Sequence, residues 1–185
     1  MATDVSICNS ALIKLGAERI SSLSDISKEA ILCNEQYEKI LTDLLYSHPW
    51  NFATKSAIWQ SNGNLHPWTE MEEFDLPDDY LRVLDFKSPY IEWAMENGKL
   101  YANEAELYIR YIFYQDDPEA FSVKFVELFA VKLALELSYS LVQSASLKDS
   151  IQREYEQCLR DARSFDSQEG KPGRVDNGAW LQVRL

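Results

Sequence analysis

The sequence has little of the material from which enzyme active sites are commonly built. It contains two histidines, three cysteines and six glycines among 185 residues. The cysteines Cys8, Cys33 and Cys158 lie far apart and form no CxxC pair, which favours small buried thiols in a reducing compartment over a metal or redox role. The sequence also lacks a glycine-rich phosphate loop and a GxSxG motif. We therefore expect no enzyme activity, no catalytic residue, no metal and no cofactor.

Positive charge and long apolar runs are equally scarce. Lys and Arg number 18 against 30 Asp and Glu, which gives a net charge of −12. Tight binding to nucleic acid needs Lys and Arg against the phosphates, and this chain has an excess of acidic residues instead. An acidic surface suits the wall of a passage through which DNA moves without binding. No apolar run approaches the ~20 residues of a membrane span, and residues 1–4 lack the basic start of a signal peptide. We expect a soluble protein that is made in a cytoplasm and has no membrane partner.

The composition is otherwise that of a folded protein. Hydrophobic residues make up 46% of the chain and charged residues 26%, which argues against wholesale disorder and predicts one domain, with or without an insertion. Aromatic residues are plentiful, with 5 Trp, 10 Tyr and 8 Phe. Some of them exceed the needs of a small core, and aromatic side chains commonly hold subunits together.

Apolar residues at helical spacing predict two helices in the first 50 residues. Thr3 is a good N-cap for the first helix, and Gly16 tolerates the left-handed conformation that ends it. Ser27 can cap the second helix, which must end near His48 because Pro49 restricts the residue before it.

Two further helices are predicted near the other end of the chain. Asp117-Pro118 is expected to open the third helix, with Asp as N-cap and Pro as the first helical residue. Its wide apolar face predicts the most buried helix. Ser146 followed by Asp149 resembles a capping box that opens the fourth helix.

The pattern between residues 53 and 116 is that of short strands. Asn97-Gly98 is a strong signal for a two-residue hairpin, flanked by Ile91–Met95 and Leu100–Ala102. Leu107–Tyr114 is rich in strand-forming residues with apolar side chains on both faces. Trp93, Asn97 and Gly98 would lie at or near an exposed hairpin tip, where we expect contacts with another protein of an assembly or with another subunit.

The last sixteen residues, GKPGRVDNGAWLQVRL, differ in charge from the rest. They carry a net charge of +2, which leaves −14 for residues 1–169 because the whole chain carries −12. Basic residues beside a Trp and aliphatic residues predict a docking arm rather than a solvated tail. Its docking residues are expected to be Lys171, Arg174, Trp180, Leu181, Val183, Arg184 and Leu185.

Together these patterns predict a mainly α fold with a β insertion (α+β). A four-helix bundle core is expected from residues 1–52 and 117–169, an inserted antiparallel β-unit from 53–116, and an extended, flexible C-terminal arm from 170–185. The bundle would pack around one set of apolar side chains, one or two from each helix. They are Leu12, Leu44, Phe125, Leu128 and Tyr155.

Two other functional classes stay open. A small acidic hydrolase could use Asp78, Asp79 or His48 if these groups converge in a pocket. A nucleic-acid module could stack bases on Tyr108–Tyr114, but only Arg110 is basic in that stretch. His-Pro-Trp occurs at 48–50 and again at 66–68, and each copy is interpreted as a corner anchored by its Trp.

An ordered set of segments resembles one family of phage structural proteins, the head-to-tail adaptors of the tail tubular protein A type. The set spans nearly the whole chain in the expected order. Its members are ALIKLGAERISSLSD at 11–25, Glu29-Ala30, Cys33-Asn34, Tyr37, Leu44-Leu45, HPWNFA at 48–53, Pro67-Trp68, FDLPDDYLR at 74–82, 111–121 ending in DPEAF, Ala162-Arg163 and DSQE at 166–169.

The resemblance implies a virion protein in the tail or neck region. It implies a helical bundle with a β insertion, assembled as a dodecameric ring between the portal protein and a tail nozzle or other tail protein. DNA would pass through the ring without specific binding, and the C-terminal arm would reach into the portal. Related adaptors also act as neck or head-completion proteins in other phages, so this alternative stays open.

Overall fold

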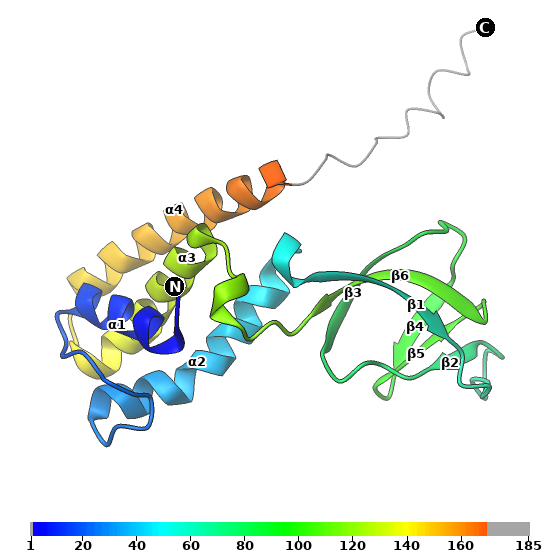
Figure 1. Ribbon diagram of the computed structural model, residues 1–185, viewed down its shortest axis with the longest axis horizontal. Helices are drawn as coiled ribbons and strands as arrows, with labels where there is room; N and C mark the ends of the chain where they lie inside the picture. The colour runs from blue at the N-terminus through cyan, green and yellow to red at the C-terminus, as the bar shows by residue number, and fades with distance from the viewer. Residues whose placement is uncertain (1, 170–185) are drawn as a thin grey trace, which may run out of the picture.

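The computed structural model describes residues 2–169, with the helices gathered at one end and the strands at the other (Figure 1). Within that range the chain forms four α-helices, six strands and two short 3-10 helices. In chain order they are α1 (Asp4–Leu15), α2 (Lys28–Ser47), η1 (Asn51–Ala53), β1 (Thr54–Gln60), β2 (Glu72–Phe74), β3 (Tyr80–Phe86), β4 (Trp93–Glu96), β5 (Lys99–Ala102), β6 (Glu106–Phe113), η2 (Pro118–Ala120), α3 (Val123–Leu141) and α4 (Ala145–Glu169). The mixed α+β class is therefore confirmed.

The ends of α1 and α2 follow from their sequences. Thr3 and Ser6 form a reciprocal capping box at the start of α1, and Gly16 closes the helix with a left-handed φ of 67°. The Ser27 hydroxyl accepts a hydrogen bond from the Ala30 amide, and His48 before the proline is the C-cap of α2. These four predicted boundaries are confirmed.

Helix α3 is the centre of the helical part. It packs against α1, α2 and α4, and ten of its residues are buried. Leu12, Leu44, Phe125 and Leu128 are all fully buried in one hydrophobic cluster, and Tyr155 packs against that cluster from α4. Cys8 and Cys33 are buried in the same cluster, where a hydrogen bond between the two thiols and burial raise the pKa of Cys8.

An aromatic corner joins the helical part to the strands. Trp50 is fully buried and its indole N–H donates to the Leu44 carbonyl at 2.8 Å. Its ring packs edge-to-face on Phe125, and Phe52 stacks between Trp50 and Phe121. The chain turns here from α2 through η1 into β1, so the corner fixes where the strands begin.

The strands form a pair of small antiparallel sheets. One has the order β1-β6-β3 and the other β2-β5-β4. Their facing sides share a second hydrophobic cluster that includes Trp59, Phe74, Leu100 and Leu107. We call residues 54–113, with both sheets, the sheet unit.

Two predicted helix starts are wrong. Asp117 does act as an N-cap, accepting from the Glu119 amide, but it caps the short η2 rather than α3. Phe121 is extended at ψ 137°, which breaks the helix, and Ser122 then caps α3 through the Phe125 amide. Residue 121 turns inward to join the aromatic corner, which a continuous helix from Pro118 would prevent.

The predicted capping box of α4 is displaced by two residues. The helix begins at Ala145, and Ser144 rather than Ser146 accepts a hydrogen bond from the Leu147 amide. Asp149 consequently lies inside the helix. The predicted arm at 170–185 lies outside the described residues.

Candidate functional site

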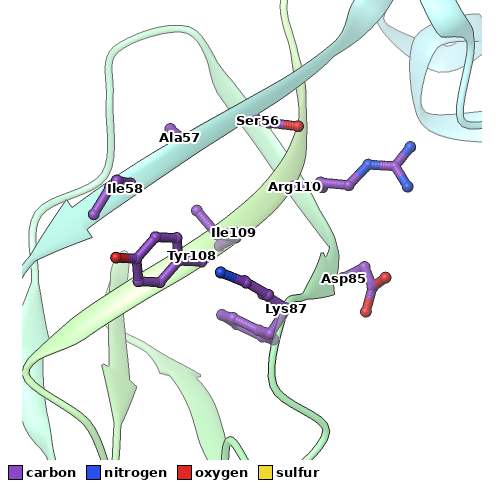
Figure 2. A pocket seen from close by; sticks show the side chains of 9 residues that line it. Ser56, Ala57, Ile58, Asp85, Lys87, Tyr108, Ile109 and Arg110 are labelled. Carbon is purple, nitrogen blue, oxygen red and sulfur yellow. The ribbon is translucent and has the colours of Figure 1, made fainter.

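A groove lies over the outer side of the β1-β6-β3 sheet. Its volume is about 510 Å³, and Figure 2 shows the side chains that line it. They come from three neighbouring strands and the residue after β3. The lining residues are Ser56, Ala57, Ile58, Asp85, Phe86, Lys87, Tyr108, Ile109 and Arg110.

The groove exists because the helices cover only part of this sheet face. Successive side chains of a strand point to opposite faces, so Tyr108, Arg110 and Ile112 share one face of β6. Ile112 is fully buried in the helical cluster, whereas Arg110 and Tyr108 are exposed. The other face of β6 packs into the cluster between the sheets through Leu107 and Tyr111. The groove thus begins where the helical cover ends.

Strand pairing brings the apolar side chains of the groove together. Ile58 lies opposite Tyr108 in the β1–β6 register, and the two are 56% and 44% exposed. An isoleucine and a tyrosine that are adjacent and open to solvent form an apolar patch suited to a partner. Phe86 lies opposite Ile109 in the β3–β6 register and packs against the cluster between the sheets, so the exposed apolar patch of the groove is formed by Ile58 and Tyr108.

Charges of both signs flank this patch. The Lys87 ammonium lies 4.6 Å from the centre of the Tyr108 ring, and the Lys87 amide donates to the Tyr108 carbonyl at 2.9 Å. Asp85 lies opposite Arg110 in the register. Glu106, next on the same face, accepts a hydrogen bond from the Tyr108 hydroxyl and raises its pKa. The groove can therefore receive a segment that carries one large apolar side chain together with charges.

The predicted hairpin is confirmed, with small shifts in its strands. Asn97 and Gly98 have φ of 48° and 73°, as a two-residue turn between β4 and β5 requires. All four residues of β4 are exposed, including Trp93 at 45%, which packs on Phe86 at a ring distance of 5.7 Å. Strand β5 is largely buried, so the surface available for contacts is β4 and the turn.

The predicted docking arm, with Lys171, Arg174, Trp180, Leu181, Val183, Arg184 and Leu185, lies outside the described residues. The structure does place its starting point. Asp166, in the last turn of α4, is 5% exposed, and its carboxylate accepts from the Asn51 amide at 2.9 Å and contacts His48 Nε2 at 3.1 Å. The end of α4 is therefore attached to the segment that leads into β1 (Figure 1).

The structure separates the groups considered for a hydrolase. His48 is paired with Asp166, whereas Asp79 binds Lys55 at 2.5 Å in the sheet unit. Burial lowers the pKa of His48, and the hydrogen bond with Asp166 opposes that shift. Among residues 2–169, no group of three or more His, Cys, Asp or Glu side chains is placed to hold a metal ion. None of the helices in that range is long and apolar enough to cross a membrane.

Comparison with known proteins does not identify a family for this chain. No protein-family model matches the chain, and no curated protein matches it either.

Sequence reasoning missed two features of this region. Asp166 continues the helical spacing of the buried Ala162 by one turn, a signal that could have placed it on the inner side of α4. The adjacent Phe165, although apolar, is 41% exposed. The groove had no comparable signal, because Ile58, Asp85 and Tyr108 are brought together only by pairing between strands far apart in the chain.

Proposed function

We propose that this protein is a structural virion protein, a head-to-tail adaptor that forms a ring between a portal and a tail. In this proposal α1–α4 act as a four-helix bundle that forms the body of each subunit, with the sheet unit as an inserted contact module. The ring would be dodecameric, as the family resemblance implies, with a central channel for DNA.

The observation that carries the proposal is the set of exposed aromatic side chains on the sheet unit. Trp68, Tyr90 and Trp93 are 90%, 84% and 45% exposed, and Met95 and Tyr108 are also exposed. Surfaces with exposed aromatic side chains are typical of contacts with other proteins. The sheet unit therefore offers a surface suited to assembly.

Charge supports the same assignment. The chain carries a net charge of −12. An acidic channel wall would repel the phosphates of DNA and allow it to pass. A DNA-binding role would instead require basic side chains along the contact surface.

The proposal is tested by binding to the portal protein encoded with this chain. We expect the full chain to co-sediment with assembled portal and a variant without residues 176–185 to lose that binding. Circular dichroism of the variant checks that the fold is retained. Undiminished co-sedimentation of the shortened protein would show that the arm is not the docking element.

The alternative of a neck or head-completion protein makes a different prediction. Such a protein would also bind the portal side, but it would complete heads to which no short tail is attached. Electron microscopy of particles lacking this protein distinguishes the two, because an adaptor is needed for tail attachment.

A further inference from the structure

We propose that the groove on the β1-β6-β3 sheet is a docking site for the chain's own segment 170–185. The inference concerns the free protein and does not depend on the adaptor role. It assigns an occupant to an exposed apolar surface that the fold leaves uncovered.

The first argument is position. Asp166 holds the last turn of α4 against Asn51, three residues before β1. Thr54, the first residue of β1, lies opposite Ile112, where the helical cover of the sheet face ends. From Thr54 to Ile58 is four residues of strand, about 13 Å at ~3.3 Å each. The segment therefore starts beside the covered end of the face that carries the groove.

The second argument is length. Sixteen residues follow Glu169 in the sequence. Fully extended they span about 50 Å at ~3.3 Å per residue. That is several times the length of strand between the end of the helical cover and Ile58. The segment can therefore reach the groove of its own molecule with Trp180 and Leu181, ten or more residues after α4.

The third argument is chemistry. The segment offers Trp180, Leu181 and Val183 to the apolar patch of Ile58 and Tyr108. Its net charge of +2 meets a sheet unit in which acidic residues outnumber basic ones. Asp85 lines the groove together with Lys87 and Arg110, so the groove itself offers one acidic partner, and Glu106 on the same face of β6 offers a second beside it.

The size of the groove favours a short segment over a whole subunit. A volume of about 510 Å³ is in the range of sites that enclose a small ligand or one large side chain. A stable interface between folded subunits typically buries ~800 Å² on each partner, which is a larger and flatter surface. Tethering gives the segment an effective concentration on the order of millimolar, so a modest contact suffices to hold it.

If the adaptor role is correct, docking has a regulatory consequence. A segment held in the groove is withheld from the portal, and binding to the portal would have to displace it. The free protein would then be kept from premature assembly.

The test is photo-crosslinking in the full chain. A photoreactive phenylalanine analogue is placed at Ser56, which lines the groove, and at the control position Ile26, which is 94% exposed and lies before α2. We expect position 56, and not position 26, to crosslink to peptides from 170–185. A mixture of unlabelled and isotope-labelled protein shows whether the joined peptides come from one molecule.

Variants sharpen the test. Ile58→Asp and Trp180→Ala should each reduce the crosslink from position 56 about tenfold, the effect of losing roughly one buried large apolar side chain. Ile26→Asp is the matched control and should leave it unchanged. Chymotryptic cleavage after Trp180 should accelerate about tenfold in Ile58→Asp for the same reason.

Three results would overturn the proposal. They are crosslinks from position 56 to residues 2–169 of a second copy, crosslinks that join labelled to unlabelled molecules, and no crosslink above that of position 26. The first would make the groove a subunit interface.

Discussion

The tripeptide His-Pro-Trp occurs once at the corner of the helical part and once in the sheet unit, with opposite outcomes. Trp50 is fully buried and bonded to the Leu44 carbonyl, whereas Trp68 is 90% exposed. His48 pairs with the buried Asp166, whereas His66 pairs with Glu96, whose side chain is 66% exposed. The prediction that each Trp anchors a corner is confirmed for Trp50 and wrong for Trp68.

The difference lies in what surrounds each copy. Trp50 packs on Phe52 and on Phe125 of α3, and Phe52 packs in turn on Phe121. Around His66 the loop folds onto β4 and β5 through Glu96 and Tyr101, which leaves the neighbouring indole in solvent. The same local sequence thus stabilises the fold in one place and supplies contact surface in the other.

The largest expected effect separates the two tryptophans. Trp50→Ala should lower the free energy of unfolding by about 3–5 kcal/mol, because it empties a fully buried site and removes the indole hydrogen bond to the Leu44 carbonyl. Trp68→Ala should change it by less than about 0.5 kcal/mol. Chemical denaturation followed by circular dichroism measures both, and equal losses would contradict the comparison.

The next effect separates the two carboxylate partners. Asp166→Ala leaves the Asn51 amide and His48 without their acceptor in a buried site and should cost about 1–3 kcal/mol. Glu96→Ala removes an exposed partner and should cost at most about 1 kcal/mol. Denaturation midpoints of the two variants should therefore rank in that order, and the reverse rank would refute the role of Asp166.

A smaller effect concerns pH. Burial lowers the pKa of His48 in the folded protein below the ordinary value of 6.5, so protons bind the unfolded chain more readily. The stability that His48 contributes should be complete above pH 6.5 and should be lost as the pH falls from 6.5 through its folded pKa. In His48→Gln the unfolding free energy should change less between pH 7.5 and 5.5. An unchanged dependence of the unfolding free energy on pH in this variant would show that His48 does not cause the effect.

The smallest effect on stability is expected at the hairpin. Trp93→Ala removes an exposed side chain. Among the aromatic rings of the described residues, Trp93 packs only on Phe86, so the substitution should lower the free energy of unfolding by less than about 1 kcal/mol. We expect the protein to stay folded while assembly of complete particles falls. Normal yields of infectious particles from this variant would refute a contact role for β4.

The features predicted from sequence are those fixed by near neighbours. The caps at Thr3, Gly16 and Ser27 and the Asn97-Gly98 turn depend on hydrogen bonds or φ values within a few residues. The apolar stripe of α3 was sufficient to predict its central place. These signals depend on residues close together in the chain, so they can be recognised in a single sequence.

What failed depends on distant partners. Asp117-Pro118 is a sound helix start locally, but Phe121 is drawn into the aromatic corner by Trp50 and Phe52 from another part of the chain. The groove requires Ile58, Asp85 and Tyr108 to meet through pairing of β1, β6 and β3. The spacing of residues within one segment does not predict which residues of other strands will lie beside them.

The central claim is that the chain assembles with a portal as a ring. Its most direct test is the mass of the purified full chain, measured alone and with assembled portal by analytical ultracentrifugation. The account predicts a complex whose added mass equals a ring of subunits of 21.4 kDa, about twelve on the family resemblance. Two species that sediment separately at every ratio, with no added mass on the portal, would contradict it.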